Sequence, residues 1–312
     1  HSPFADSLFL KEETVEPILD WGIQVILWLQ QYSSPALDSF FKGVTFLGDE
    51  EFIFLLLPIL YWLVDRTMGL HLSLLLALSA YFNSLTKAIV DQPRPFVYDT
   101  RVPALIEATE DGFPSGHTQI SVVLWGYLAQ HFRRAWLWIA AGLLILLVPL
   151  SRIYLGVHFP TDLLGGYVIG ALLLGLFLWI APRLSAWLTR LRPWQQVGLI
   201  TLSAALLILL YPQRNGISNA GSLLGLGYGI LLERRWIRFD VAGSGQQKTL
   251  RLVVGLVTAA AAYFGLRVAF AALEPALLFR FVRYALISLW IVTGAPWLFV
   301  KTGLAPTEDG AS

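Results

Sequence analysis

The stretch Ala135–Tyr154, AWLWIAAGLLILLVPLSRIY, decides the fold class of this chain. It carries no charged side chain before Arg152, and at 1.5 Å per residue it is long enough to cross the hydrocarbon core of a bilayer as an α-helix. The stretch therefore predicts a transmembrane helix.

Similar apolar stretches recur on both sides of it, which indicates a polytopic, all-α membrane protein and not a soluble domain with one anchor. Hydrophobic residues make up 56% of the 312 residues and charged residues 14%, a composition that a soluble domain does not have. With polar interruptions as boundaries, about nine transmembrane helices are predicted. They are Phe52–Val64, Met68–Val90, His117–Phe132, Ala135–Tyr154, Asp162–Pro182, Trp194–Tyr211, Ser218–Leu232, Leu250–Leu273 and Phe281–Val300.

Two segments before these spans, Trp21–Tyr32 and Ala36–Leu47, carry apolar residues at helical spacing among polar ones. This pattern is typical of helices that lie in the membrane interface. A further span hidden among them is the alternative.

Basic residues predict the orientation, because Lys and Arg in short loops favour the cytoplasm. They fall in alternate connections of the nine-helix topology: Arg66; Arg133 and Arg134; Arg183, Arg190 and Arg192; Arg234, Arg235, Arg238 and Lys248; and Lys301. The side that holds them is predicted to be cytoplasmic. The opposite side keeps Lys87, Arg94 and Arg152, which need another explanation.

The overall charge and the lack of cysteine exclude several functions. A net charge of +1 argues against a nucleic-acid partner, since binding to a phosphate backbone needs a clustered basic surface. Without cysteine there is no thiolate catalysis, no disulfide and no thiolate metal site.

Polar residues are concentrated in three short segments on the predicted non-cytoplasmic side: Lys87–Pro95, Pro114–His117 and Ser151–Asp162. Each lies at a predicted membrane boundary, so the three can converge on one pocket. Lys87, Arg94 and Arg152 supply one point charge and two planar guanidinium groups that match the oxygens of a phosphate.

The second segment begins an apolar helix. Ser115 and Gly116 precede it, so the N–H groups of Gly116 and His117 are expected to point at an anion, with the helix dipole behind them. The cations and this helix start predict a phosphate cradle.

The third segment predicts a nucleophile. His158 lies four residues before Asp162, and a carboxylate bonded to one ring nitrogen leaves the other free to attack. His117 remains as the general acid that protonates the departing alkoxide.

The motifs Lys-x6-Arg-Pro, Pro-Ser-Gly-His and Ser-Arg-x5-His-x3-Asp resemble the three-part signature of the type 2 phosphatidic acid phosphatase superfamily, over roughly Leu47–Pro182. The resemblance implies a six-helix phosphatase core without metal or other cofactor. It implies that His158 forms a phosphohistidine, that His117 is the acid and that Asp162 supports His158. The residues implied to bind phosphate are Lys87, Arg94, Ser115, Gly116 and Arg152.

This core suggests three regions: interfacial helices over 1–47, a catalytic core over 48–192, and additional C-terminal transmembrane helices with a tail over 193–312. The extra helices, the stretch Phe46–Phe52 and the stretch Ser151–His158 are similar to sphingosine-1-phosphate phosphatases. A sphingoid-base 1-phosphate, or a phosphatidate-like lipid, is therefore the expected substrate. The expected partners are this lipid and the bilayer, and a homodimer is possible.

Three other functions use similar features. A polyprenyl diphosphate phosphatase or a vanadate-dependent haloperoxidase would use the same cradle. A transporter or channel would place charges along a path through the membrane. Here the polar motifs lie at a membrane boundary, which favours an enzyme.

Two further patterns have plain structural interpretations. Gly221, Gly225 and Gly229 recur every four residues, which predicts close helix packing more readily than a ligand groove. Glu107, Glu110 and Asp111 are most simply a solvated acidic loop, although such a loop can also shape access to the site.

Overall fold

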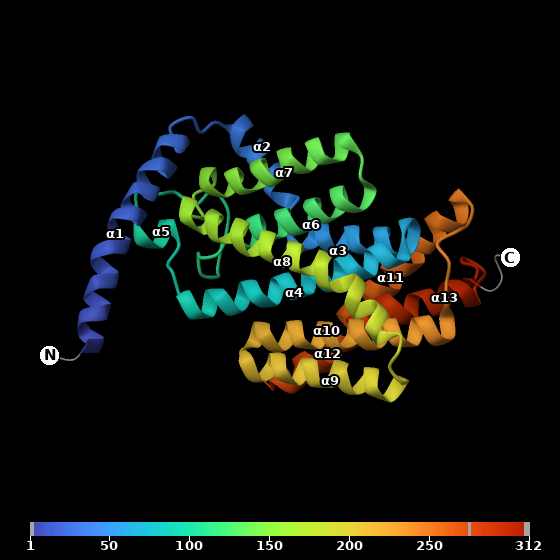
Figure 1. Cartoon of the computed structure of the whole chain (residues 1–312). Coiled ribbons are helices and arrows are strands. Elements are labelled where there is room, and N and C mark those ends of the chain that lie inside the picture. The colour runs from blue at the N-terminus through green and yellow to red at the C-terminus, as the bar shows by residue number, and fades with distance from the viewer. Residues whose placement is uncertain (1–2, 274–275, 309–312) are drawn as a thin grey trace. The chain divides into compact units, whose positions relative to one another are not determined.

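The chain is built from helices in a computed structural model that describes residues 3–273 and 276–308 (Figure 1). Within these residues, extended segments pair only at an isolated antiparallel bridge between Phe239 and Thr307. The predicted all-α fold is confirmed for this part of the chain. Residues 1–2 of the predicted N-terminal region and residues 309–312 of the predicted C-terminal region lie outside the described residues.

The elements follow one another in this order: α1 (Pro3–Gln30), α2 (Pro35–Phe46), α3 (Glu50–Ile59), the π-helix η1 (Leu60–Val64), α4 (Arg66–Val90), α5 (Pro95–Tyr98), α6 (Gly116–Phe132), α7 (Ala135–Tyr154), α8 (Pro160–Leu188), α9 (Pro193–Leu210), α10 (Arg214–Leu232), the π-helix η2 (Glu233–Ile237), α11 (Gly245–Phe270), α12 (Leu277–Leu289), the π-helix η3 (Trp290–Gly294) and α13 (Ala295–Lys301).

Helices long and apolar enough to cross a membrane number six among the described residues. They are Arg66–Tyr98, Ala135–Tyr154, Pro160–Leu188, Pro193–Leu210, Gly245–Phe270 and Leu277–Lys301. Large apolar side chains stand exposed along them, such as Leu146 at 63% and Leu172 at 67%, as expected for helices solvated by lipid. The protein is an integral membrane protein, and the count of nine spans stays a prediction.

By packing, the chain forms two compact units. The first comprises residues up to Asp49 and Thr86–Leu172, and the second comprises Glu50–Leu85 and the chain from Leu173 onward. The predicted regions with boundaries at residues 48 and 193 divide the sequence in another way and stay a prediction.

The first unit holds the three polar segments, and its core joins α1 to the end of α7 and the start of α8. The helix α1 begins at Pro3, well before the predicted Trp21. Next to it, α2 starts after the cap Ser34, whose hydroxyl accepts the N–H of Leu37 at 3.3 Å. The helices α6 and α7 pack side by side (Figure 1). The buried cluster comprises Leu19, Ile23, Ile26, Val102, Ile153, Phe159 and Leu163.

In the second unit, the glycine repeat brings α10 against α12. A Cβ atom at Gly221 would lie 2.5 Å from the carbonyl oxygen of Phe281, and one at Gly225 would lie 2.1 Å from that of Ala285. Since no side chain fits at such distances, the predicted close helix packing is confirmed.

Candidate active site

The end of α4 and the turn that follows it carry two cations of the site, Lys87 and Arg94. Lys87 lies in the last turn of α4, which stops at Val90 because Asp91 takes the left-handed conformation, with φ at 50°. Arg94 immediately precedes α5. Both cationic side chains are almost fully buried, at 6% and 7% exposure. Because buried charges need partners, each of these two cations must be paired within the protein or by a ligand.

His158 is buried in the turn between α7 and α8. Its Nδ1 lies 3.0 Å from Oδ2 of Asp162, an oxygen that also accepts the backbone N–H of Phe159 at 2.9 Å. A carboxylate accepts hydrogen bonds, so Nδ1 carries the ring proton and Nε2 keeps its lone pair.

The second carboxylate oxygen of Asp162 is also occupied. Oδ1 accepts from Nε2 of Gln92 at 2.7 Å. Sequence reasoning did not single out Gln92, although it is a polar side chain in the turn between Lys87 and Arg94. The side-chain amide of Gln92 therefore links the segment Lys87–Pro95 to the segment Ser151–Asp162.

Arg94 faces the free nitrogen of His158. Its Nη1 lies 3.0 Å from Nε2 of His158 and donates to the carbonyl of Val157 at 2.8 Å, while its Nε donates to the carbonyl of Glu110 at 2.6 Å. The guanidinium is thereby fixed beside the atom expected to attack phosphorus.

Lys87 reaches the acidic loop. Its Nζ donates to the carbonyl of Asp111 at 2.8 Å and lies 3.1 Å from Oε2 of Glu110. Glu107 and Glu110 are exposed, as expected for a solvated loop, and Glu110 and Asp111 also hold two of the site's cations, which agrees with the alternative that the loop shapes the site.

The start of α6 meets this cluster through backbone contacts. Ser115 is its buried cap: its hydroxyl accepts the N–H of Thr118 at 3.3 Å, and its own N–H donates to the carbonyl of Asp162 at 3.0 Å. Gly166 of α8 packs so closely that a Cβ there would lie 2.7 Å from the carbonyl oxygen of Ser115. At this helix start, the N–H of Gly116 precedes the intrahelical hydrogen bonds and can serve a ligand.

Arg152, in the last turn of α7, is 4% exposed. Its Nη1 donates to Oγ1 of Thr45 at 2.7 Å, whereas its buried Nε has no hydrogen-bond partner among the described residues. A buried donor left unpaired costs about 1–3 kcal/mol, so this nitrogen suits an anionic ligand.

His117, the second residue of α6, has a carboxylate partner of its own. Its Nε2 lies 2.7 Å from Oδ1 of Asp49. Sequence reasoning assigned no role to Asp49 or to Thr45, the partner of Arg152. A carboxylate in the turn after Gly48, just before an apolar helix, was the available signal for Asp49.

The charges around His158 decide its protonation. Burial, with the nearby cations Arg94, Arg152 and Lys87, lowers the pKa of His158 well below its usual value of 6.5. The ring is therefore neutral at pH 7, as a nucleophile must be.

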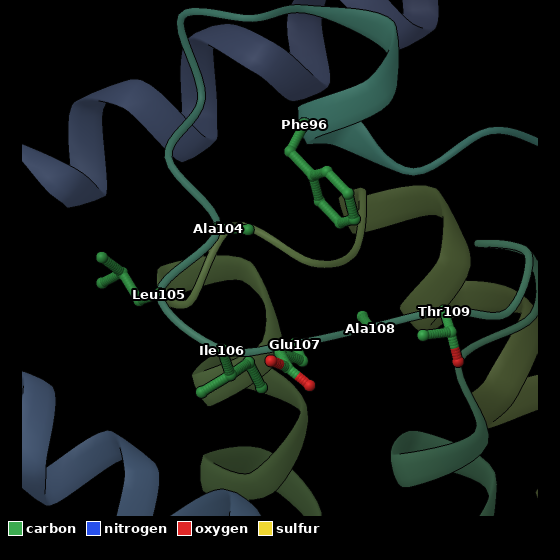
Figure 2. Close-up of a pocket in the computed structure, with 7 residues that line it drawn as sticks. All are labelled: Phe96, Ala104, Leu105, Ile106, Glu107, Ala108 and Thr109. Atoms are coloured by element: carbon green, nitrogen blue, oxygen red, sulfur yellow. The ribbon is translucent and has the colours of Figure 1, made fainter.

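A pocket of about 520 Å³ lies along the loop that leads to Glu110 (Figure 2). Its lining comprises Phe96, Ala104, Leu105, Ile106, Glu107, Ala108 and Thr109. The loop is tied to the turn before His158, because the N–H of Leu105 donates to the carbonyl of Leu155 at 3.0 Å. Several of its side chains pack against the buried Tyr154, Leu155 and Val157. Glu107 brings an exposed carboxylate to an otherwise largely apolar lining.

The site consists of a buried histidine surrounded by buried cations at the ends of membrane helices, which defines a class of integral membrane protein with a charged site. The model of the PAP2 superfamily matches residues 68–186, and a model described as PAP2 superfamily phosphatase, transmembrane extension, matches residues 217–307. The chain belongs to the PAP2 superfamily, and the resemblance of its motifs to that family is confirmed.

Relatives with curated names agree with this membership. Phosphatidylglycerophosphatase B of Bacillus subtilis is 30% identical over 152 residues, covering 45% of this chain and 72% of that protein. Lipid phosphate phosphatase delta of Arabidopsis thaliana is 31% identical over 183 residues, covering 54% of this chain and 44% of that protein. A probable sphingosine-1-phosphate phosphatase of Dictyostelium discoideum is 28% identical over 163 residues, covering 47% of this chain and 39% of that protein.

Among solved structures, a transmembrane PAP2-type phosphatidylglycerolphosphate phosphatase from Bacillus subtilis matches with a TM-score of 0.48 and 25% identity. The match covers 58% of this chain and 94% of that one. The chain spans less than half the length of the plant and Dictyostelium relatives.

Proposed function

We propose that this protein is a membrane lipid phosphatase that hydrolyses a phosphomonoester through a phosphohistidine at His158. One observation carries the proposal: the buried ring has Nδ1 on the carboxylate of Asp162 and Nε2 against the guanidinium of Arg94. This arrangement directs a lone pair toward the place where a cation would hold a phosphoryl oxygen.

In the first step, Nε2 of His158 attacks phosphorus and forms the P–N bond while the bond from phosphorus to the lipid oxygen breaks. His117 gives its proton to the departing alkoxide, so the lipid leaves as an alcohol. Asp162 stabilises the positive charge that develops on His158.

The non-bridging oxygens carry the charge in the transition state. Lys87, Arg94 and Arg152 would bind them, together with the N–H groups of Gly116 and His117 at the start of α6. Ser115, as the cap of α6, keeps that helix start in place.

In the second step, water attacks phosphorus and the P–N bond breaks. His117, now neutral, takes a proton from the water, and the electron pair of the broken bond returns to His158. Inorganic phosphate leaves and both histidines are restored.

A lipid is the expected substrate because the site lies at the ends of membrane helices, and because the relatives are named for lipid phosphates. A sphingoid-base 1-phosphate is the first candidate. The carboxylate of Glu107 at the neighbouring pocket would attract the ammonium group that such a lipid carries and phosphatidate lacks.

The non-cytoplasmic face is the proposed location of the site. The support is the distribution of basic residues, because most of them fall in connections on the other side of the predicted topology.

The test is phosphate release by the purified protein in detergent, with a sphingoid-base 1-phosphate, a phosphatidate and a polyprenyl diphosphate offered separately. H158A should release no phosphate above background, and the wild-type protein quenched in turnover should carry acid-labile phosphate on His158. Turnover by H158A near the wild-type rate would refute the mechanism. A clear preference for the diphosphate would replace the proposed substrate class.

A further inference from the structure

The segment Thr45–Asp49 adds a fourth part to the site described above. We infer that Asp49 is a positioning residue that holds His117 and favours its protonated form, an inference that rests on the proposed role of His117 as general acid. The segment lies outside the three sequence motifs and outside the PAP2 superfamily match at residues 68–186.

Two side chains of this segment bind two site residues. Oδ1 of Asp49 lies 2.7 Å from Nε2 of His117, and Oγ1 of Thr45 accepts from Nη1 of Arg152 at 2.7 Å. Each contact joins residues more than 60 positions apart, with separations of 68 and 107 residues. The turn therefore contacts both His117, the proposed acid, and Arg152, one of the cations proposed to bind phosphate.

Gly48 allows this approach. A Cβ atom there would lie 2.8 Å from Cδ2 of His117, closer than carbon atoms pack. Two backbone hydrogen bonds close the turn: the N–H of Gly48 donates to the carbonyl of Thr45 at 2.9 Å, and that of Asp49 donates to the carbonyl of Phe46 at 3.0 Å. The backbone of the turn therefore positions the carboxylate of Asp49 against the imidazole of His117.

The charges that face His117 act in opposite directions. Burial and the cations Arg152 and Arg94 lower the pKa of His117 from 6.5 to about 4, and Asp49 opposes this shift. Without Asp49, burial and two cations would act on the acid unopposed, and only the charge of a bound phosphate would favour its protonated form. A neutral His117 has no proton to give to an alkoxide.

Asp49 is itself ionised at neutral pH. Burial alone would raise the pKa of Asp49, but the hydrogen bond from His117 and the charges of His117 and Arg152 outweigh burial and lower it. With Nε2–H of the imidazolium held by this carboxylate, the N–H at Nδ1 is the one available to the leaving oxygen.

The decisive experiment compares D49N with the wild-type protein on two phosphomonoesters, an alkyl lipid phosphate and p-nitrophenyl phosphate. The asparagine keeps a polar contact and removes the charge. For the lipid, the alkaline limb of kcat against pH should move down by about 1–3 units, as expected when an opposite charge at this distance is lost. For the aryl ester the loss should be much smaller, because its leaving group departs without protonation.

Three further variants make the result specific. E51Q removes a carboxylate from an exposed position two residues away and should leave both activities unchanged. D49E keeps the charge and should show the wild-type pH profile. It therefore tests the inference even where D49N does not fold. In the H117N background D49N should add no further loss, because the two residues act as a unit.

An unshifted pH profile in D49N, or equal losses on the two esters, would overturn the inference. So would a D49E protein that folds but behaves like D49N. If H158A is inactive in the same assay, these D49N and D49E results contradict only the role of Asp49 and not the proposed function. An active H158A would contradict the proposed function, whatever Asp49 does.

Discussion

Oδ2 of Asp162 lies 3.0 Å from Nδ1 of His158 and accepts the N–H of Phe159, so one oxygen holds both the ring and the backbone next to it. A charge alone would not fix the ring in this way. The contact sets the tautomer, and with it the nitrogen that faces Arg94.

Replacing Asp162 with asparagine should lower kcat for lipid phosphate by about 10²–10⁴-fold, with little change in KM. The amide can turn its N–H₂ group toward Nδ1 and stabilise the wrong tautomer. Steady-state phosphate release by the purified variant measures this. D91N makes the same substitution at an exposed position near the site and should keep wild-type activity. A fall in D162N below about tenfold would contradict the role given to this carboxylate.

The pH dependence of the wild-type protein follows from His158. Burial and the surrounding cations lower its pKa well below 6.5, so the ring stays neutral until the pH falls well below that value. Activity due to His158 is therefore present above the lowered pKa and lost below it. A plot of kcat/KM against pH should keep its acid limb well under pH 6.5, and a midpoint at or above 6.5 would disagree with this environment.

Glu107 tests the choice of lipid. E107Q should lower kcat/KM for a sphingoid-base 1-phosphate by about two- to fivefold, the range expected for an exposed ion pair, and leave phosphatidate unaffected. The matched control E107D keeps the charge. Competition between the two lipids in one assay gives the ratio directly, and equal effects on both would exclude Glu107 as a determinant of specificity.

The glycine repeat predicts a stability effect away from the site. G225A should destabilise the protein by about 1–3 kcal/mol, because the added methyl group would overlap the carbonyl of Ala285. G265A, on α11, is the control, since a Cβ there meets no atom within 4 Å. Thermal unfolding in detergent should show a lower Tm for G225A alone. Equal Tm values would mean that α10 and α12 can separate at no cost.

The helical fold and most of the site were predictable because they depend on local patterns. Apolar runs of membrane length mark α4, α7, α8, α9 and α11. The structure brings together all three motifs in one compact unit, as expected from their position at one membrane boundary. The number of spans was harder to predict, since segments such as α6, with 17 residues, fall near the minimum length for crossing a bilayer.

The partners of the site residues were not predictable in the same way. Asp49, Thr45 and Gln92 belong to no pattern that points to His117, Arg152 or Asp162. The contacts of the acidic loop were not predictable for the same reason, because composition places Glu110 in solvent, where it is, and does not show that its carboxylate lies 3.1 Å from Nζ of Lys87.

Hydropathy and the spacing of the motifs determined, from the sequence alone, that this chain is a helical membrane protein of the PAP2 superfamily, and they predicted a phosphate-binding histidine site. Both are properties of residues close together along the chain. Only the tertiary structure decided which nitrogen of His158 is free, which carboxylate faces His117 and which cations share the acidic loop. These depend on atoms within about 3 Å of one another, brought together by helix packing from distant parts of the sequence.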